Sequence, residues 1–292
     1  MQFYTMEKEP IYITECPRDA MQGIKEFIPT EKKVMYIQGL LDVGFDVLDF
    51  GSFVSPKAIP QMKDTPDVLR KLDLSHTNTR LLSIVANKRG ALDALQFDQI
   101  DFLGFPFSIS ETFQIRNTNA GIEQSLERVL DIQDLCLTNH KNLMVYISMA
   151  FGNPYGDPWN LGIASHWVER LVQAGITHFA LSDTVGIANP ESIAYLFEGL
   201  INTYPLCHFG AHLHTQPSNW YRNVKAAYES GCRKFDAAIK GYGGCPMAKD
   251  DLTGNLPTEN LLLFCEQNGI PCDLDKDALI LAEDRATKVF PI

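Results

Sequence analysis

Two histidines separated by one residue, His212 and His214, lie in an apolar segment that is typical of a β-strand. Side chains two positions apart on a strand point to the same face, so both imidazoles can bind one ion; the alternative is a pair of hydrogen-bonded core histidines. Asp19 and Asn255 follow other predicted strands and favour the metal site. Because imidazole nitrogens with carboxylate and amide oxygens form a mixed ligand set, these residues predict a divalent cation: Mg²⁺ or Mn²⁺ first, with Zn²⁺ or Co²⁺ as alternatives.

Arg18 directly precedes Asp19, which would place a permanent cation beside the metal. A guanidinium group in this position can stabilise negative charge on an enolate or a carbonyl oxygen. A structural ion pair is the alternative, since Arg–Asp pairs on protein surfaces are common and weak. We therefore treat Arg18 as a candidate catalytic residue.

Cys245 lies in the segment GYGGCP, whose glycines allow unusual backbone angles. We expect a mobile loop at about residues 241–256 that carries the thiol over the site and withdraws it. An inert cysteine that only fills space is the alternative.

Further polar residues follow the predicted strands. Asp49, in the second strand segment, is a candidate catalytic carboxylate. Lys57 follows that strand and is a candidate for phosphate binding; the alternative is an exposed lysine at the rim of the barrel that binds no ligand. We expect five residues to contact the substrate: Gln22, Ser52, Lys57, Asp183 and Thr184.

Eight short apolar segments rich in Ile, Val and Phe alternate with helical patterns along the chain. They comprise residues 11–16, 46–53, 79–87, 100–108, 143–151, 178–185, 208–215 and 234–241. Eight strand–helix units without a linker predict an α/β fold in which residues 1–292 form one (β/α)₈ TIM barrel; an open doubly wound sheet is the competing topology. In a barrel the candidate residues fall at the C-terminal strand ends, where such enzymes place their active sites.

The helical patterns end on glycine. In residues 30–44, Thr30 offers an N-cap, apolar residues recur at three- and four-residue spacing, and Gly44 can end the helix. The same ending recurs at Gly175 and Gly231, each followed by a predicted strand. These glycines indicate the turns that connect helices to strands.

The composition limits the class of partner. The chain has 292 residues and a formal net charge of −11 at pH 7, so nucleic acids and anionic membranes are not expected partners. The seven cysteines are scattered without a CxxC pair, which favours reduced thiols. No signal peptide, transit peptide or membrane-spanning run is recognisable. We expect a soluble cytoplasmic protein that acts on a small molecule.

Five segments together closely resemble the hydroxymethylglutaryl-CoA lyase family of metal-dependent TIM-barrel enzymes. They are TECPRDAMQ (14–22), SFVSPKAIPQM (52–62), LSDTVGIANP (181–190), AHLH (211–214) and GYGGCPMAKDDLTGNLPTEN (241–260). The resemblance spans nearly the whole chain and implies cleavage of 3-hydroxy-3-methylglutaryl-CoA to acetyl-CoA and acetoacetate. It places Asp19, His212, His214 and Asn255 at the metal-binding positions, and Arg18 and Cys245 at the catalytic positions.

The resemblance also implies a mechanism and a homodimer. A base removes the C3 hydroxyl proton of the acyl-CoA, the C2–C3 bond breaks, and Arg18 stabilises the resulting thioester enolate. His212 and Cys245 would take part in the proton transfers.

Some positions depart from the family pattern. Asp49 stands where a glutamate is usual, Met144 replaces an arginine of some members, Asn153 replaces a cysteine, and Thr215 to Pro217 replace the usual residues after HLH. Three alternatives therefore stay open: a lyase for a different 3-hydroxyacyl-CoA, an enzyme that condenses acetyl-CoA with a 2-oxo acid, and a non-catalytic barrel that binds acyl-CoA.

Overall fold

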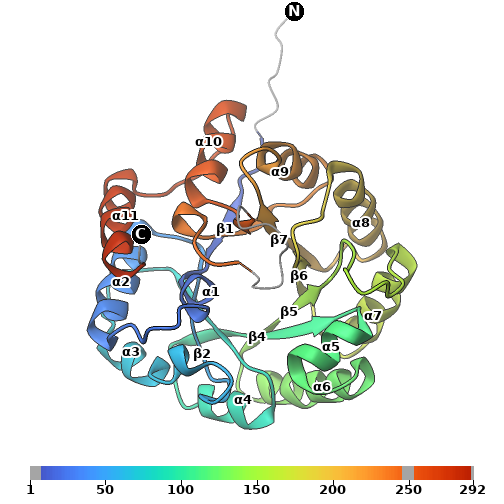
Figure 1. The fold of residues 1–292 in the computed structure, drawn as a ribbon, viewed down its shortest axis with the longest axis horizontal. Coiled ribbons are helices and arrows are strands. Elements are labelled where there is room, and N and C mark those ends of the chain that lie inside the picture. The colour runs from blue at the N-terminus through green and yellow to red at the C-terminus, as the bar shows by residue number, and fades with distance from the viewer. Residues whose placement is uncertain (1–7, 245–252, 291–292) are drawn as a thin grey trace, which may run out of the picture.

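Residues 8–244 and 253–290, the part of the chain that the computed structural model describes, form a closed barrel of eight parallel strands inside a ring of helices (Figure 1). Neighbouring strands pair in chain order, and β8 closes the ring by pairing with β1, where Thr14 lies opposite Asp236. The (β/α)₈ barrel is therefore confirmed, and the open sheet is wrong. The strands are β1 (Tyr12–Glu15), β2 (Val47–Ser52), β3 (Arg80–Ile84), β4 (Ile100–Ser108), β5 (Asn142–Ser148), β6 (His178–Asp183), β7 (His208–Thr215) and β8 (Lys234–Ala237).

All eight predicted strand segments contain a strand of the barrel. A further short strand, β9 (Gly254–Asn255), runs antiparallel to the end of β7. The helices are α1 (Pro17–Gln22), α2 (Thr30–Val43), α3 (Thr65–Lys71), α4 (Lys88–Ala94), α5 (Glu111–Thr118), α6 (Ile122–Thr138), α7 (Leu161–Gln173), α8 (Pro190–Thr203), α9 (Trp220–Glu229), α10 (Thr258–Asn268) and α11 (Lys276–Val289), with 3₁₀ turns η1 (Pro60–Met62) and η2 (Ile239–Gly241). Among the described helices, none is both long and apolar enough to cross a bilayer.

The α2 helix ends as predicted but begins differently. Gly44 adopts a left-handed conformation with φ 84°, and Gly175 and Gly231 do the same. Thr30 is not the N-cap, however: Pro29 takes that position, and the Thr30 hydroxyl instead donates to Asp64 Oδ2 at 2.7 Å. The predicted cap is wrong because Thr30 is already the first helical residue, so the cap position falls on Pro29, which has no side-chain acceptor.

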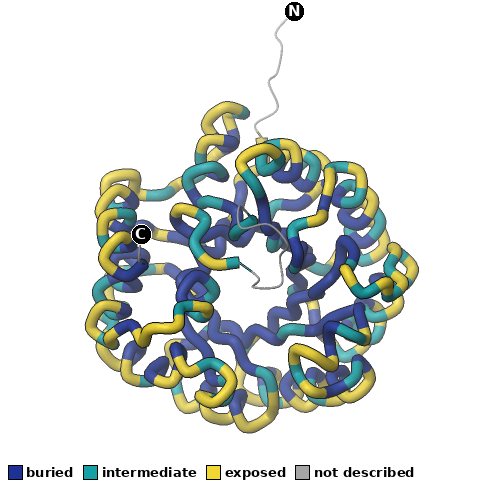
Figure 2. Tube along the Cα trace, in the orientation of Figure 1, coloured by how far each residue is buried: buried dark blue, intermediate teal, exposed yellow. Residues whose placement is uncertain are grey.

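Alternating strand residues divide the core into two apolar layers. One set packs between the strands and the helices, so the strands are mostly buried beyond their first residues and the helices are exposed mainly on their outer faces (Figure 2). The opposite set, which includes Leu82, Phe102, Met144 and Tyr146, forms a separate cluster on the inner face of the barrel. Met144, one of the departures from the family pattern, therefore serves apolar packing below the polar strand ends.

A buried carboxyl group connects the closing strand to the last helices. Glu15, at the end of β1, is fully buried; the Ile239 amide donates to its Oε1 at 2.8 Å and Thr258 hydrogen-bonds to its Oε2 at 2.5 Å. Burial raises the pKa of Glu15 to about 8, against the effect of these hydrogen bonds. Glu15 is thus protonated at neutral pH and ties β1 to the start of α10.

This buried acid makes stability depend on pH. Between the ordinary pKa near 4.5 and the folded value near 8, only the unfolded chain is ionised, so the free energy of unfolding should fall as pH rises through this window. Glu15→Gln imitates the protonated acid and should remove the fall, which amounts to about 1.4 kcal/mol for each pH unit in the window. Urea unfolding of the wild type and of Glu15→Gln at pH 5, 7 and 8.5 measures the free energy of unfolding of each protein. If the difference in this free energy between the two proteins does not change with pH, the assignment is contradicted.

Candidate active site at the barrel mouth

Three predicted metal ligands converge at the C-terminal ends of the strands. One ligand atom from each of Asp19, His212 and His214 lies within 4.8 Å of the other two. Asp19 comes from α1, which begins directly after β1 with Pro17 at its first turn, and both histidines come from β7. The period of the strand puts the imidazoles on one face, while the intervening Leu213 packs in the outer core. The structure therefore brings together three side chains that the sequence predicts as ligands.

The second nitrogen of each imidazole is fixed by an oxygen. Nδ1 of His212 lies 3.0 Å from Asp236 Oδ2, and Nδ1 of His214 lies 3.1 Å from the Thr184 carbonyl oxygen. Because both oxygens act as acceptors, each Nδ1 carries the hydrogen and each Nε2 presents its lone pair. The bond from an imidazole to a carboxylate or a carbonyl is the arrangement that orients histidine ligands for metals.

An unpaired buried nitrogen tests whether a cation fits. Nε2 of His214 is buried and makes no hydrogen bond with any described residue. Burial lowers the pKa of His214 to about 4, so this lone pair is available at neutral pH. For His212, burial lowers the pKa, but the hydrogen bond and charge of Asp236 outweigh it and raise the pKa, so a cation there competes with a proton. A lone pair buried beside the Asp19 carboxylate fits a divalent cation.

Asn255 completes this group of polar side chains. Its amide nitrogen donates to Asp19 Oδ2 and to the Tyr242 carbonyl, both at 2.9 Å, which leaves the amide oxygen as an acceptor. Asn255 lies opposite His214 in the β7–β9 pairing. All four predicted ligands are thus brought together; their role as ligands stays a prediction.

Arg18 and Asp49 form a buried ion pair beside these ligands. Nη2 of Arg18 lies 2.5 Å from Asp49 Oδ2, and Nε donates to both carboxylate oxygens. Nη1 of Arg18 donates to Asp19 at 3.0 Å and to Gln22 at 2.9 Å. Although it is one methylene shorter than the usual glutamate, Asp49 therefore reaches Arg18. Burial raises the pKa of Asp49 to about 6, against the charge of Arg18.

The same charges keep Asp19 ionised. Burial acts to raise its pKa, but Arg18 and the two imidazoles outweigh burial and lower the pKa to about 2. Gln22 adds a hydrogen bond from its amide to Asp19 Oδ1 at 3.0 Å. Asp19 is thus an ionised carboxylate whose orientation is fixed from two sides.

A second potential ligand group shares His212. Atoms of Cys16, His212 and Asp236 also lie within 4.8 Å of one another. Nδ1 of His212 is already bonded to Asp236, and burial raises the pKa of the Cys16 thiol well above its usual range. Because a thiol binds metals as the thiolate, this group is the poorer site.

Four residues expected to bind substrate lie in different surroundings. The Ser52 hydroxyl is buried and donates to the Ile84 carbonyl, and Lys57 is exposed. The Asp183 carboxylate accepts hydrogen bonds from the amides of Ile187 and Ala188 in its own loop. Thr184 orients His214 through its carbonyl group. Their contacts with a substrate stay predictions.

Sequence reasoning missed Asp236 and Tyr146. Asp236 was the one carboxylate inside the eighth segment, a signal that could have found it. The ring of Tyr146 packs edge-on against His212 with centroids 5.8 Å apart, and no local pattern indicates that contact.

Cys245 and residues 246–252 lie outside the described residues, but the segments on both sides are described. Gly243 has φ 85°, and a Cβ atom there would lie 2.7 Å from Ala20 Cα and 2.9 Å from Asn255 Nδ2. The four predicted ligands, Asp19, His212, His214 and Asn255, are called the ligand group below. The GYGG segment packs directly on Asp19 and Asn255 of this group, and only glycine fits at position 243.

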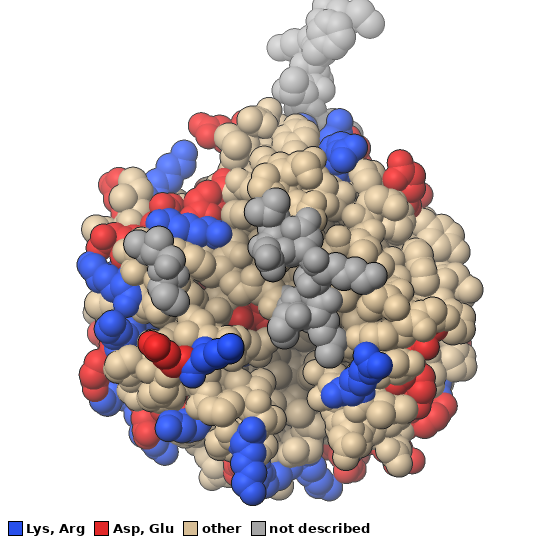
Figure 3. All heavy atoms as spheres, viewed as in Figure 1, with Lys and Arg blue, Asp and Glu red and all other residues tan. Residues whose placement is uncertain are grey.

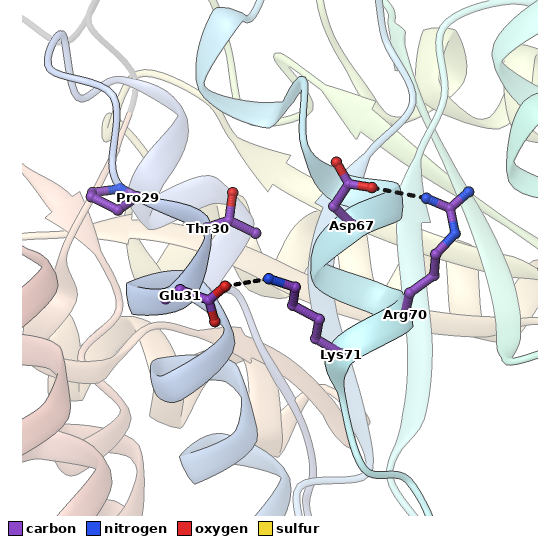
Figure 4. Close-up of a pocket in the computed structure, with 6 residues that line it drawn as sticks. All are labelled: Pro29, Thr30, Glu31, Asp67, Arg70 and Lys71. Carbon is purple, nitrogen blue, oxygen red and sulfur yellow. Dashed lines mark hydrogen bonds and ion pairs between the residues drawn. The ribbon is translucent and has the colours of Figure 1, made fainter.

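Two grooves lie outside the ligand group. One, of about 590 Å³, begins at Ile24, directly beyond α1, and includes Lys25, Phe27, Lys32 and Lys288. Figure 3 shows lysine and arginine side chains around the rim of this face and a hollow near its centre. The other, of about 470 Å³, lies between α2 and α3; its charged side chains form the pairs Glu31–Lys71 and Asp67–Arg70, so we assign it no ligand (Figure 4).

The chain is similar to known proteins over most of its length. The family model described as HMGL-like matches residues 10–285. The chain is 30% identical to hydroxymethylglutaryl-CoA lyase YngG of Bacillus subtilis, covering 94% of this chain and 92% of that protein. It is 31% identical to the 3-hydroxy-3-isohexenylglutaryl-CoA/hydroxy-methylglutaryl-CoA lyase of Pseudomonas aeruginosa, covering 94% and 90%. The mitochondrial hydroxymethylglutaryl-CoA lyase of Arabidopsis thaliana, 30% identical over 93% of this chain, is longer, and the chain spans 58% of it.

The fold is also similar to that of a solved structure of this kind of enzyme. An HMG-CoA lyase from Acinetobacter baumannii in complex with coenzyme A and 3-methylmalate is 30% identical and superposes with a TM-score of 0.88, covering 99% of this chain and 93% of that chain.

The Asp236–His212 bond gives a test of the metal site. Asp236→Asn keeps the shape but removes the charge that orients and polarises His212, so affinity for Mn²⁺ at pH 8 should fall about tenfold or more. Titration calorimetry measures it. Asp101→Asn is the matched control, because Asp101 accepts a backbone hydrogen bond from Leu81 at the other end of the barrel and should leave affinity unchanged. Equal affinities in the two variants would remove Asp236 from the site.

Proposed function

This chain belongs to the HMGL-like family, and from that premise we propose that it is a metal-dependent carbon–carbon lyase that cleaves 3-hydroxy-3-methylglutaryl-CoA to acetyl-CoA and acetoacetate. The observation that carries the proposal is the convergence of Asp19, His212 and His214 beside Arg18 at one end of the barrel. The cytoplasmic location, the single-domain organisation and the homodimer stay predictions.

The four clustered polar residues would hold the cation, with Mg²⁺ or Mn²⁺ proposed. A divalent cation held by Asp19, His212, His214 and Asn255 would supply a Lewis acid that orients the C3 hydroxyl and a substrate carboxylate or carbonyl oxygen. The chain's own contribution is to orient these ligands: Asp236 orients His212, Thr184 orients His214 and Gln22 orients Asp19.

Arg18 has one hydrogen left for the substrate. A guanidinium group has five N–H donors, and four of these donate to Asp49, Asp19 and Gln22. The second hydrogen of Nη2 has no partner among the described residues. We propose that it donates to the thioester oxygen, where negative charge develops when the C2–C3 bond breaks. Asp49 holds the guanidinium plane in place for this contact.

The proton balance needs a base and an acid. The C3 hydroxyl loses its proton and becomes the ketone of acetoacetate, the C2–C3 electron pair enters the thioester enolate, and C2 gains a proton to give acetyl-CoA. We propose His212, paired with Asp236, and Cys245 for these two transfers; His212 acts in this way only when its Nε2 is released from the cation, because one lone pair cannot bind a cation and a proton together. Tyr146 packs against His212 and excludes water from that side.

An acyl-CoA substrate also needs a site for its phosphates. We propose the groove that begins at Ile24, because Lys25, Lys32 and Lys288 line it and because α1 connects it to Arg18 and Asp19. The chain as a whole is acidic, Glu26 also lines the groove and Lys288 pairs with Asp284, so Lys25 and Lys32 supply most of the local positive charge that we propose for the CoA phosphates.

The assay of the proposed activity uses Mn²⁺-loaded protein with hydroxymethylglutaryl-CoA and, in parallel, 3-hydroxy-3-isohexenylglutaryl-CoA. Mass spectrometry should detect acetyl-CoA. Arg18→Lys should lower kcat about 100-fold or more while metal content is unchanged, because a lysine cannot pair with Asp49 through two nitrogens and still reach the oxyanion. Exposed Arg89→Lys is the control. No acetyl-CoA from either thioester, or a product formed from acetyl-CoA and a 2-oxo acid instead, would sink the lyase assignment.

The groove is tested by reversing one charge. Lys25→Glu should raise KM for the acyl-CoA about tenfold, with kcat nearly unchanged, because it weakens phosphate binding away from the reacting atoms. Lys88→Glu, an exposed lysine on α4, is the matched control. If both variants keep the wild-type KM, the phosphates bind elsewhere.

A further inference from the structure

Gln61 is a buried polar residue for which the proposed chemistry has no role. It lies in η1 and is 3% exposed. Its side chain makes three hydrogen bonds, all with the backbone of residues 24–28: Nε2 donates to Ile24 O at 3.0 Å and Glu26 O at 2.8 Å, and Oε1 accepts from Ile28 N at 2.9 Å. One amide group thus uses both donors and its acceptor on a single segment.

The segment has little other support. Residues 24–29 form neither a helix nor a strand, and most of them are exposed. Because backbone groups that are taken from water must be paired, Gln61 replaces the pairing that a neighbouring strand would provide. The conformation of residues 24–28 therefore depends on this side chain.

Gln61 is itself fixed from behind by α2. Lys33, which is 1% exposed, donates to the Gln61 backbone carbonyl and to Asp64 Oδ1, the latter at 2.6 Å. The Lys33 ammonium also lies 4.2 Å from the centroid of the Phe27 ring. These contacts connect Gln61, the following turn and the tip of the segment into one rigid unit.

The segment occupies a functional position. It follows α1, which carries Arg18, Asp19 and Gln22, and residues 24–29 form one wall of the groove whose other wall is the end of α11. Any change in the path of residues 24–28 would move Lys25 relative to Lys288 and alter the groove.

We propose that Gln61 is a positioning residue for acyl-CoA binding: it holds residues 24–28 in the conformation that forms the groove. The inference rests on the proposed function of the groove. Gln61 touches neither the ligand group nor Arg18, so its loss should weaken substrate binding and leave bond cleavage at saturating substrate unchanged.

The test uses two variants of different chemistry. Gln61→Met fills the same volume without hydrogen bonds. Gln61→Glu keeps the acceptor for the Ile28 amide but sets a carboxylate against two carbonyl oxygens. For both, we expect faster hydrogen exchange at residues 24–28, a KM for acyl-CoA raised about tenfold or more, kcat within about twofold of wild type, and unchanged Mn²⁺ content.

Gln38→Met is the matched control. The Gln38 side chain also bonds a backbone segment, donating to Asp73 O and accepting from Asp73 N, both near 3 Å, in the loop before β3 at the other end of the barrel. It should lower stability without changing KM.

The outcomes separate the two proposals. Unchanged exchange at residues 24–28 in both Gln61 variants overturns the inference alone. Faster exchange with an unchanged KM shows that the segment does not contact the substrate, and also overturns it. Calorimetry with coenzyme A alone on the wild-type protein tests the proposed function of the groove. If coenzyme A does not bind, that function is overturned, whatever the Gln61 variants show.

Discussion

The buried pair of Arg18 and Asp49 is the interaction on which the rest of the site depends. A guanidinium group 9% exposed, against a carboxylate 1% exposed, is costly to remove from water and is retained only because the two groups bond through two nitrogens. That bond fixes Arg18, which in turn fixes Asp19 and Gln22. The orientation of the Asp19 carboxylate, the largest contribution to its lowered pKa and the single remaining N–H of Arg18 all depend on this pair.

The imidazole side of the site is built by a different principle. His212 and His214 come from one strand, but the oxygens that orient them come from β8 and from the end of β6. Three adjacent strands must therefore be in register before both lone pairs face Asp19. The parallel pairing provides this register, with His212 aligned to Asp236 on one side and to Ser182 on the other. A closed barrel supplies such alignment without any flexible loop.

Two further features support the site: the apolar cluster inside the barrel and the irregular segment after α1. The inner apolar cluster around Phe102 and Tyr146 closes the barrel below the polar strand ends, which keeps the site dry on that side. The segment after α1 has no regular structure and is held by the single side chain of Gln61. The histidines of the site are thus positioned by strands, whereas the groove depends on residues 24–28, which Gln61 holds through hydrogen bonds.

The sequence by itself determined the elements and the candidate residues. Alternation of apolar segments with helical patterns gave eight strands, and the period of two gave the common face of His212 and His214, because both properties are local. A local pattern failed at the start of α2: the helix begins at Thr30 itself, so Pro29 is the cap residue, and the Thr30 hydroxyl donates to the distant Asp64. Asp236 behind His212, Asp49 against Arg18 and Gln61 under residues 24–28 are contacts between segments 24 to 37 residues apart. Parallel pairing of neighbouring strands brings these groups within hydrogen-bond distance, and closure of the barrel brings β7 close to Asp19, so only the tertiary structure decided which of the candidate residues act together.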